Sequence, residues 1–162
     1  KYITSPEREI MKHACGAIRS LVFEHQDMQT QFTELGVCEL LLRTLAEQRS
    51  KPEVVAEACA ALWNLSLNSD QIKSRLIEAG ACRALMLAAE ELISYPDVVQ
   101  HASGAMRNLT LNHEENRQLF ETSGATDLVI RACVGNKLTL VNTQATLEAL
   151  SIRLSPKVEG VD

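Results

Sequence analysis

The chain has few of the residues from which β-sandwiches are built. Only 4% of its 162 residues are aromatic, and it contains 7 glycines and 4 prolines. Alanine and leucine are abundant instead, and these residues favour helices over the strands that valine, tyrosine and phenylalanine prefer. Hydrophobic residues make up 46% of the chain, which is enough for a core of ordinary size. The composition therefore predicts an all-α protein.

Long apolar runs and an excess of basic charge are also missing. No stretch approaches the roughly 18 apolar residues that indicate a membrane-spanning helix, and the first residues lack the apolar core of a signal peptide. The formal net charge is −5, so no broad basic surface indicates nucleic acid or an anionic membrane as a partner. We predict a cytoplasmic protein, with a nuclear location left open, that neither binds nucleic acid nor inserts into membranes.

Motifs of catalysis and metal binding are missing as well. The sequence has no G-x-G-x-x-G, G-x-x-x-x-G-K-[ST], H-E-x-x-H or G-x-S-x-G segment. Its five cysteines include no C-x-x-C pair. His13 and His101 occupy equivalent positions, but they stand two repeats apart, on the order of 20 Å in a stack of helices. We predict no enzyme activity, no catalytic residue, no metal and no cofactor.

What the sequence does contain is a repeat of 44 residues. Three glycines recur at this step, namely Gly36, Gly80 and Gly124. Three similar segments recur at the same step, HACGAIRSLVFE (13 to 24), EACAALWNLSLN (57 to 68) and HASGAMRNLTLN (101 to 112), and a weaker copy, QATLEALSIRL (144 to 154), follows after 43. A period of this length is typical of a helical solenoid.

The cysteines follow the same step. Cys15 and Cys59 are 44 residues apart, and so are Cys38 and Cys82, while Cys133 stands alone. Equivalent positions in a repeat are a simpler explanation for this spacing than disulfides or a metal site. We predict that the cysteines are small buried hydrophobic residues in a reducing compartment.

Each unit is predicted to contain three helices. Pro6, Pro52 and Pro96 stand where the first turn of a helix tolerates a missing backbone donor. After Pro52, apolar residues recur at helical spacing and form one stripe of a long helix; they are Val54, Ala58, Ala61, Leu62 and Leu65. A short helix follows, the glycine ends it in a left-handed conformation, and a second helix leads to the next long helix. Each unit is thus a short helix, a second helix and a long third helix.

These units cover almost the whole chain. We predict the third helix of a partial repeat over 5–24, repeats over 25–68, 69–112 and 113–154, and a tail over 155–162. Because no unit can bury its apolar faces alone, stacking makes one continuous core, with the third helices on the inner wall of a superhelix. We expect the chain to be a fragment of a longer array whose neighbouring repeats cover its ends.

Two segments of the unit resemble a known family. The pairing of E-A-G-A (78 to 81) with A-L-W-N-L-S (61 to 66), repeated as T-S-G-A (122 to 125) with A-M-R-N-L-T (105 to 110), resembles the armadillo repeat of β-catenin, importin-α and the adenomatous polyposis coli protein. The resemblance implies a right-handed α-solenoid with three helices per repeat. It also implies a non-catalytic scaffold that binds an extended peptide along the groove of its third helices.

The resemblance further implies which residues line that groove. In the family an inner-helix asparagine bonds the backbone of the bound peptide, because an amide offers both a donor and an acceptor. Asn64 and Asn108 match this position, while serines replace the asparagine in the outer copies. Neighbouring positions add charged, aromatic and polar side chains. The predicted partner-binding residues are Arg19, Ser20, Glu57, Trp63, Asn64, His101, Arg107 and Asn108.

Each of these residues also has a purely structural interpretation. The two asparagines would then tie adjacent third helices together, Trp63 would be partly buried packing, and Arg19 and Arg107 would be solvated charges. A second function also stays open, in which the array docks on a folded partner or on itself through an outer face or an open end. A nuclear-import adaptor is disfavoured, because the tryptophans of importin-α-like repeats are replaced here by Gly16, Ala60, Gly104 and Leu147.

Overall fold

A computed structural model describes residues 6–67, 69–135 and 140–149, without the side chains of 133–135 and 140–144. Every regular element in these ranges is a helix. In chain order the helices are α1 (Pro6–Val22), α2 (Gln26–Glu34), α3 (Val37–Glu47), α4 (Pro52–Leu65), α5 (Asp70–Glu78), α6 (Ala81–Glu91), α7 (Pro96–Thr110), α8 (Glu114–Thr122), α9 (Ala125–Gly135) and α10 (Leu140–Ala149). The prediction of an all-α fold is confirmed.

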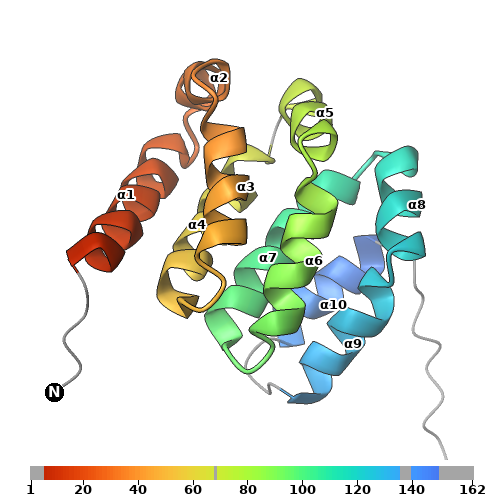
Figure 1. The fold of residues 1–162 in the computed structure, drawn as a ribbon. Helices are drawn as coiled ribbons and strands as arrows, with labels where there is room; N and C mark the ends of the chain where they lie inside the picture. Colours follow the sequence, from red (N-terminus) through yellow and green to blue (C-terminus); the bar gives the residue numbers. More distant parts are fainter. Residues whose placement is uncertain (1–5, 68, 136–139, 150–162) are drawn as a thin grey trace, which may run out of the picture.

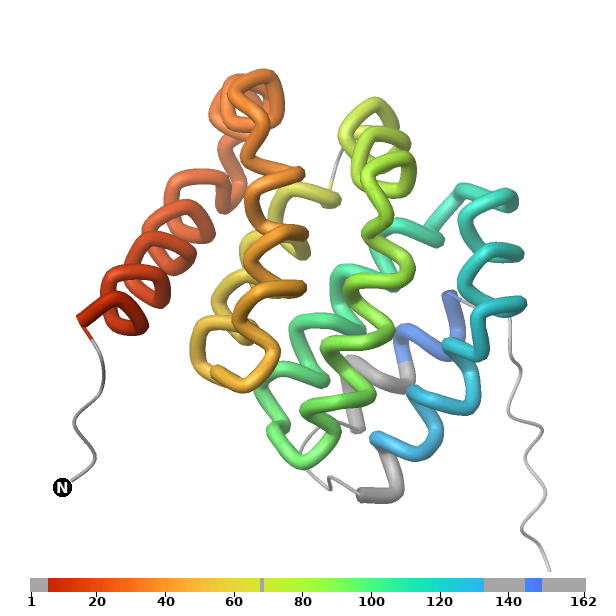
Figure 2. Tube along the Cα trace, in the orientation of Figure 1, coloured from red at the N-terminus to blue at the C-terminus, as the bar shows by residue number. Residues whose placement is uncertain are grey.

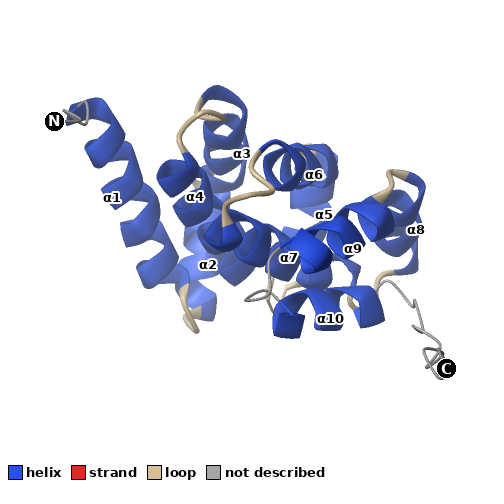
Figure 3. Ribbon diagram, turned by 90° about the horizontal axis from the view of Figure 1, so that it is seen from below, coloured by secondary structure: helices blue, strands red, loops and turns tan. Residues whose placement is uncertain are grey.

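The helices stack in the order of the sequence. Each of the three units consists of a short helix, a second helix and a third helix, and α1 precedes them (Figure 1). The third helices form one row, in which α4 packs between α1 and α7, and α7 packs between α4 and α10. The second helices α3, α6 and α9 form the other row, which lies in front of the third helices in Figure 2 and above them in Figure 3. This arrangement is an α-solenoid.

The residues predicted to start and end helices do so in the structure. Pro52 and Pro96 open α4 and α7 with an acidic residue in the first turn, which suits a missing donor and the positive end of the helix dipole. The three repeated glycines have φ between 80° and 91°, a left-handed conformation that residues with a Cβ adopt only with strain. Each glycine therefore turns the chain from a short helix into a second helix.

The core is the continuous apolar layer between the two rows. Each residue of the predicted apolar stripe of α4 is at most 1% exposed to solvent. Four cysteines are free and buried, namely Cys15, Cys38, Cys59 and Cys82, as predicted, and burial raises the pKa of the Cys59 thiol to about 12. The side chain of Cys133 lies outside the described residues.

The limits of the units stay predictions. Loops separate α1 from α2, α4 from α5 and α7 from α8 near the predicted borders. Residues 5, 68, 150–154 and the tail 155–162 lie outside the described residues.

Candidate peptide-binding groove

Five of the eight predicted partner-binding residues line one hollow on the row of third helices. The hollow has a volume of about 370 Å³, and its lining residues are Arg19, Ser20, Phe23, Ala60, Trp63, Asn64 and His101. They come from three successive rungs, namely the end of α1, the middle and end of α4, and the first half of α7. The structure thus brings together residues of different rungs that stand 37 or more positions apart in the sequence.

Trp63 forms one wall of this hollow and is also packed against the next helix. A Cβ atom built on Gly104 would lie 2.5 Å from Cδ2 of the indole, so the glycine leaves the space that the ring occupies. The indole and imidazole rings of Trp63 and His101 lie 6.0 Å apart between their centroids, tilted by 42°. One part of the half-buried indole therefore packs on α7, while another part faces the hollow.

His101 is held against the backbone of the preceding rung. Its Nδ1 lies 3.1 Å from the carbonyl oxygen of Ala56, so the tautomer with a proton on Nδ1 donates a hydrogen bond to that oxygen. Burial lowers the pKa of the imidazole, although this hydrogen bond and the carboxylates of Asp97 and Glu57 act in the opposite direction. The neutral ring is therefore the favoured form beside Trp63 at neutral pH.

The two asparagines make the same hydrogen bond on successive rungs. Nδ2 of Asn64 donates to the backbone oxygen of Arg19 at 3.0 Å, and Nδ2 of Asn108 donates to that of Trp63 at 3.1 Å. Asn108 is only 3% exposed and does not line the hollow, whereas Asn64 is half-buried and does. The structural interpretation thus accounts for both amide nitrogens. A role of these amides in peptide binding stays a prediction.

Arg19 and Glu57 form an ion pair beside the hollow. Nη1 of the arginine lies 3.3 Å from Oε2 of the glutamate, and this oxygen is buried without a hydrogen bond. The glutamate lies over Gly16, where an added Cβ would be 3.3 Å from the same oxygen. Because the arginine side chain is 40% exposed, the pair stabilises the fold by at most about 1 kcal/mol, and a partner carboxylate can compete for the guanidinium.

The other predicted residues differ in their surroundings. Exposed Ser20 donates from Oγ to the Gly16 carbonyl at 3.0 Å. Arg107 is half-buried and makes no ion pair with any residue in the described ranges. Exposed His13 lies near Glu9 and outside the hollow. The positions equivalent to Arg107 and Asn108 on the last rung, 150 and 151, lie outside the described residues.

Phe23 lines the hollow together with Ala60, and neither was among the residues predicted from the sequence; Phe23 is the larger of the two. Its ring is 52% exposed, and the residues one and two repeats later, Leu67 and Leu111, are exposed at 40% and 42%. All three follow the last turn of a third helix at the 44-residue step. An apolar residue that recurs at a solvent-exposed position was the signal in the sequence, and it indicates an apolar edge along this side of the row.

No three His, Cys, Asp or Glu side chains gather as metal ligands anywhere in the described ranges. Among the helices described, none combines the length and the apolar character needed to cross a bilayer.

Comparison with known proteins places the fold. No family model and no curated protein matches the chain. A designed armadillo repeat protein in complex with the peptide (KR)4 matches with a TM-score of 0.77 and 25% identity, over 93% of this chain and 60% of that one. Another designed armadillo repeat protein matches with a TM-score of 0.77 and 27% identity, over 91% and 60% of the two chains.

A third structure, of computationally designed armadillo repeat proteins for modular peptide recognition, matches with a TM-score of 0.78 and 27% identity, over 87% of this chain and 58% of that one. The chain thus spans about 60% of the length of the designed proteins. The resemblance found in the repeated segments and the likeness of the whole stack agree. In its fold, the chain is an armadillo-repeat protein, an all-α solenoid of three-helix repeats.

Proposed function

We propose that the chain is a protein-binding scaffold that holds an extended segment of a partner along the third helices α1, α4 and α7. The observation that carries this proposal is the hollow in which side chains of three successive rungs meet. Concave sites with apolar walls and a few convergent polar groups are where proteins bind ligands and peptides. Two of the similar designed proteins are described as bound to a peptide or built for peptide recognition, which supports this function.

The walls of the hollow favour a particular side chain. Trp63 and Phe23 offer apolar surface, and rigid aromatic residues of this kind anchor partners at a low entropic cost. Arg19 offers a guanidinium that forms paired hydrogen bonds with a carboxylate. The segment that fits best therefore places an aliphatic or aromatic side chain in the hollow and a carboxylate next to it.

The same geometry argues against an import adaptor. The tryptophans of importin-α-like repeats would stand at Ala60 and Gly104. Ala60 is buried, and the space above Gly104 is already occupied by the indole of Trp63. The basic side chains of an import signal would therefore find no pair of parallel indole walls at these positions.

The experiment that tests the proposal is a selection from a displayed library of random peptides, followed by affinity measurement on variants. Selected peptides should bind at least about tenfold more weakly to Trp63→Ala and Phe23→Ala, because each loses an aromatic contact. Arg131→Ala, an exposed arginine on α9 away from the hollow, is the matched control and should bind normally. Selected peptides that bind both aromatic variants as well as the wild type would rule out this hollow as the site.

A second function, docking on a folded partner, is favoured by an exposed stripe of α1, on the face that the preceding rung covers in α4 and α7. Ile10 and Leu21 are 66% and 48% exposed, with Ala14 and Ala17 exposed between them. The residues one and two repeats later at these positions are at most 1% exposed, because α4 and α7 bury this stripe against the preceding rung. We propose that this stripe packs on the helix of another rung, which belongs to a neighbouring repeat of the same chain, to a partner or to a second copy.

A further inference from the structure

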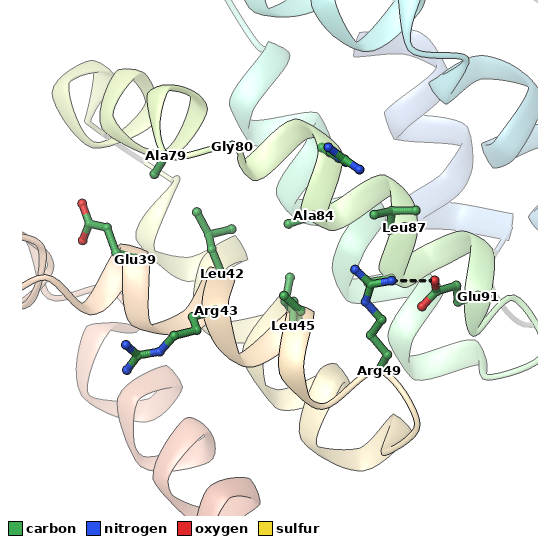
Figure 4. Close-up of a pocket in the computed structure, with 13 residues that line it drawn as sticks. Glu39, Leu42, Arg43, Leu45, Arg49, Ala79, Gly80, Ala84, Leu87 and Glu91 are labelled. Atoms are coloured by element: carbon green, nitrogen blue, oxygen red, sulfur yellow. Dashed lines mark hydrogen bonds and ion pairs between the residues drawn. The ribbon is translucent and has the colours of Figure 1, made fainter.

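The opposite side of the solenoid carries a second hollow, between the second helices α3 and α6. Its volume is about 450 Å³. Figure 4 shows Leu42 and Leu45 pointing from α3 toward α6, where Ala84 and Leu87 complete the apolar walls. We name this space the outer groove. It shares no lining residue with the hollow on the third helices.

The walls of the outer groove follow helical spacing. Leu42, Leu45 and Ala46 recur on α3, and Ala84, Leu87 and Ala88 recur on α6. The wall from residue 80 to residue 91 is about 16 Å long at the rise of an α-helix, which equals three turns. The side chains of one further helix, from a partner, can pack between two parallel walls of this length, as in other helix-in-groove complexes.

The charges around the outer groove are unequal. Its two carboxylates are both bound by arginines, since Glu39 accepts from Arg75 at 2.8 Å and Glu91 accepts from Arg49 at 3.2 Å. The hydrogen bond with Arg75 lowers the pKa of Glu39, so this carboxylate stays ionised.

Two further arginines remain on the rim. The exposed side chain of Arg43 lies 3.9 Å from that of Glu47, which is also exposed, so the two form a weak ion pair. Arg83 is exposed and makes no ion pair with a residue of the described part. A rim with spare positive charge stands out in a chain whose net charge is −5.

We propose that the outer groove docks an amphipathic helix of a partner protein, whose apolar stripe enters between α3 and α6 and whose flanking carboxylates bind Arg43 and Arg83. Ala46, Ala84 and Leu87 supply the apolar surface that a docked helix buries. Leu42 and Leu45 are already almost excluded from solvent and form the floor of the groove. The spare arginines supply selectivity, because a helix with basic flanks would meet like charges on the rim. This docking surface is independent of the groove on the third helices, so one scaffold can hold two segments at once.

The probe is a displayed library of 16-residue helices with one randomised apolar stripe and randomised flanking positions. Helices that bind the Leu87→Glu variant are removed first, because its charged side chain blocks the outer groove and such helices must bind elsewhere. Binders retained by the wild type should carry Asp or Glu at the flanks. The affinity of such a binder, made as a labelled peptide, should fall about tenfold on Arg83→Glu, because attraction becomes repulsion. It should also fall at high salt, since exposed charges are screened.

Two matched measurements make the test decisive. Arg131→Glu reverses an exposed arginine on α9 outside the outer groove and should leave the affinity unchanged. The same peptide with lysines for its glutamates should bind Arg83→Glu more tightly than it binds the wild type. Amide shifts on binding should map to α3 and α6, and Trp63→Ala should not alter them.

Enrichment of basic or uncharged flanks would overturn the proposal. So would an affinity that Arg83→Glu leaves unchanged, or amide shifts that map to α4 and α7. The proposal for the hollow on the third helices is refuted by a different result, namely normal peptide binding by Trp63→Ala. Each of the two proposals can therefore be refuted without the other.

Discussion

The contact between Trp63 and Gly104 gives the sharpest test of how adjacent rungs pack. Replacing Gly104 with alanine puts a Cβ 2.5 Å from Cδ2 of the indole, a separation that real Cβ atoms do not adopt. The ring must therefore move away from α7, and overpacking of this kind costs about 1–3 kcal/mol. The gain from replacing glycine within a helix is about 0.5–1 kcal/mol. We expect a net loss of roughly 1 kcal/mol.

Gly16 is the matched control, because it occupies the same repeat position two units earlier. A Cβ there would meet only the carboxylate of Glu57, at 3.3 Å, and this flexible side chain can shift. Gly16→Ala should therefore stabilise the protein by up to about 1 kcal/mol, so the two equivalent substitutions have opposite signs. Urea denaturation of both variants measures the difference.

The indole reports its own displacement, since Trp63 is the single tryptophan of the chain. Its emission should shift to the red in Gly104→Ala and stay unchanged in Gly16→Ala. In a Trp63→Ala background, Gly104→Ala should become stabilising, because the obstacle is gone. If Gly104→Ala is as stable as Gly16→Ala and its emission does not move, the packing of the indole on α7 is wrong.

Three other predictions address the amide, the imidazole and the exposed stripe. Asn108→Ala should lower the free energy of unfolding in urea by about 1 kcal/mol, because the carbonyl of Trp63 loses the amide of Asn108 and keeps the hydroxyl of Ser66 as a donor; an unchanged free energy would show that Asn108 does not join the two rungs. Since the pKa of His101 is lowered in the fold, the unfolded chain binds the proton more readily, so stability should fall as pH drops below about 6.5, and His101→Gln should flatten this dependence in thermal melts. Ile10→Glu with Leu21→Glu should abolish any self-association seen by sedimentation without lowering the melting temperature, because both side chains are exposed; a large loss of stability would contradict this.

The fold could be predicted because the 44-residue step fixes which faces must be buried. The stripe from Val54 to Leu65 is apolar at helical spacing, and only stacking on neighbouring units can cover it. The glycines were equally informative, since all three adopt the left-handed conformation that ends a short helix. Local signals and the global stack agree at these positions, which is why the prediction succeeds.

The candidate site could be predicted only in part. The sequence assigned Trp63 and His101 to the same groove but did not predict that their rings meet. Two interpretations of Asn108 stayed open, because hydrogen-bond partners depend on the distance between rungs. Gly16 and Gly104 occupy equivalent positions of the repeat, yet the carboxylate of Glu57 lies over Gly16 and the indole of Trp63 lies over Gly104. The outer groove was missed, since its walls belong to two different units and exist only when these are stacked.

The acceptors of the asparagine bonds have a consequence for how recognition can vary. The main-chain oxygens of Arg19 and Trp63 accept the hydrogen bonds that join adjacent rungs, while the side chains of both residues line the hollow. A main-chain oxygen is the same whichever amino acid carries it. The hydrogen bonds that join the rungs are thus independent of which side chain stands at 19 or 63. An engineer can exchange either ligand-facing group and keep these bonds, but a change at 63 also alters the packing on Gly104.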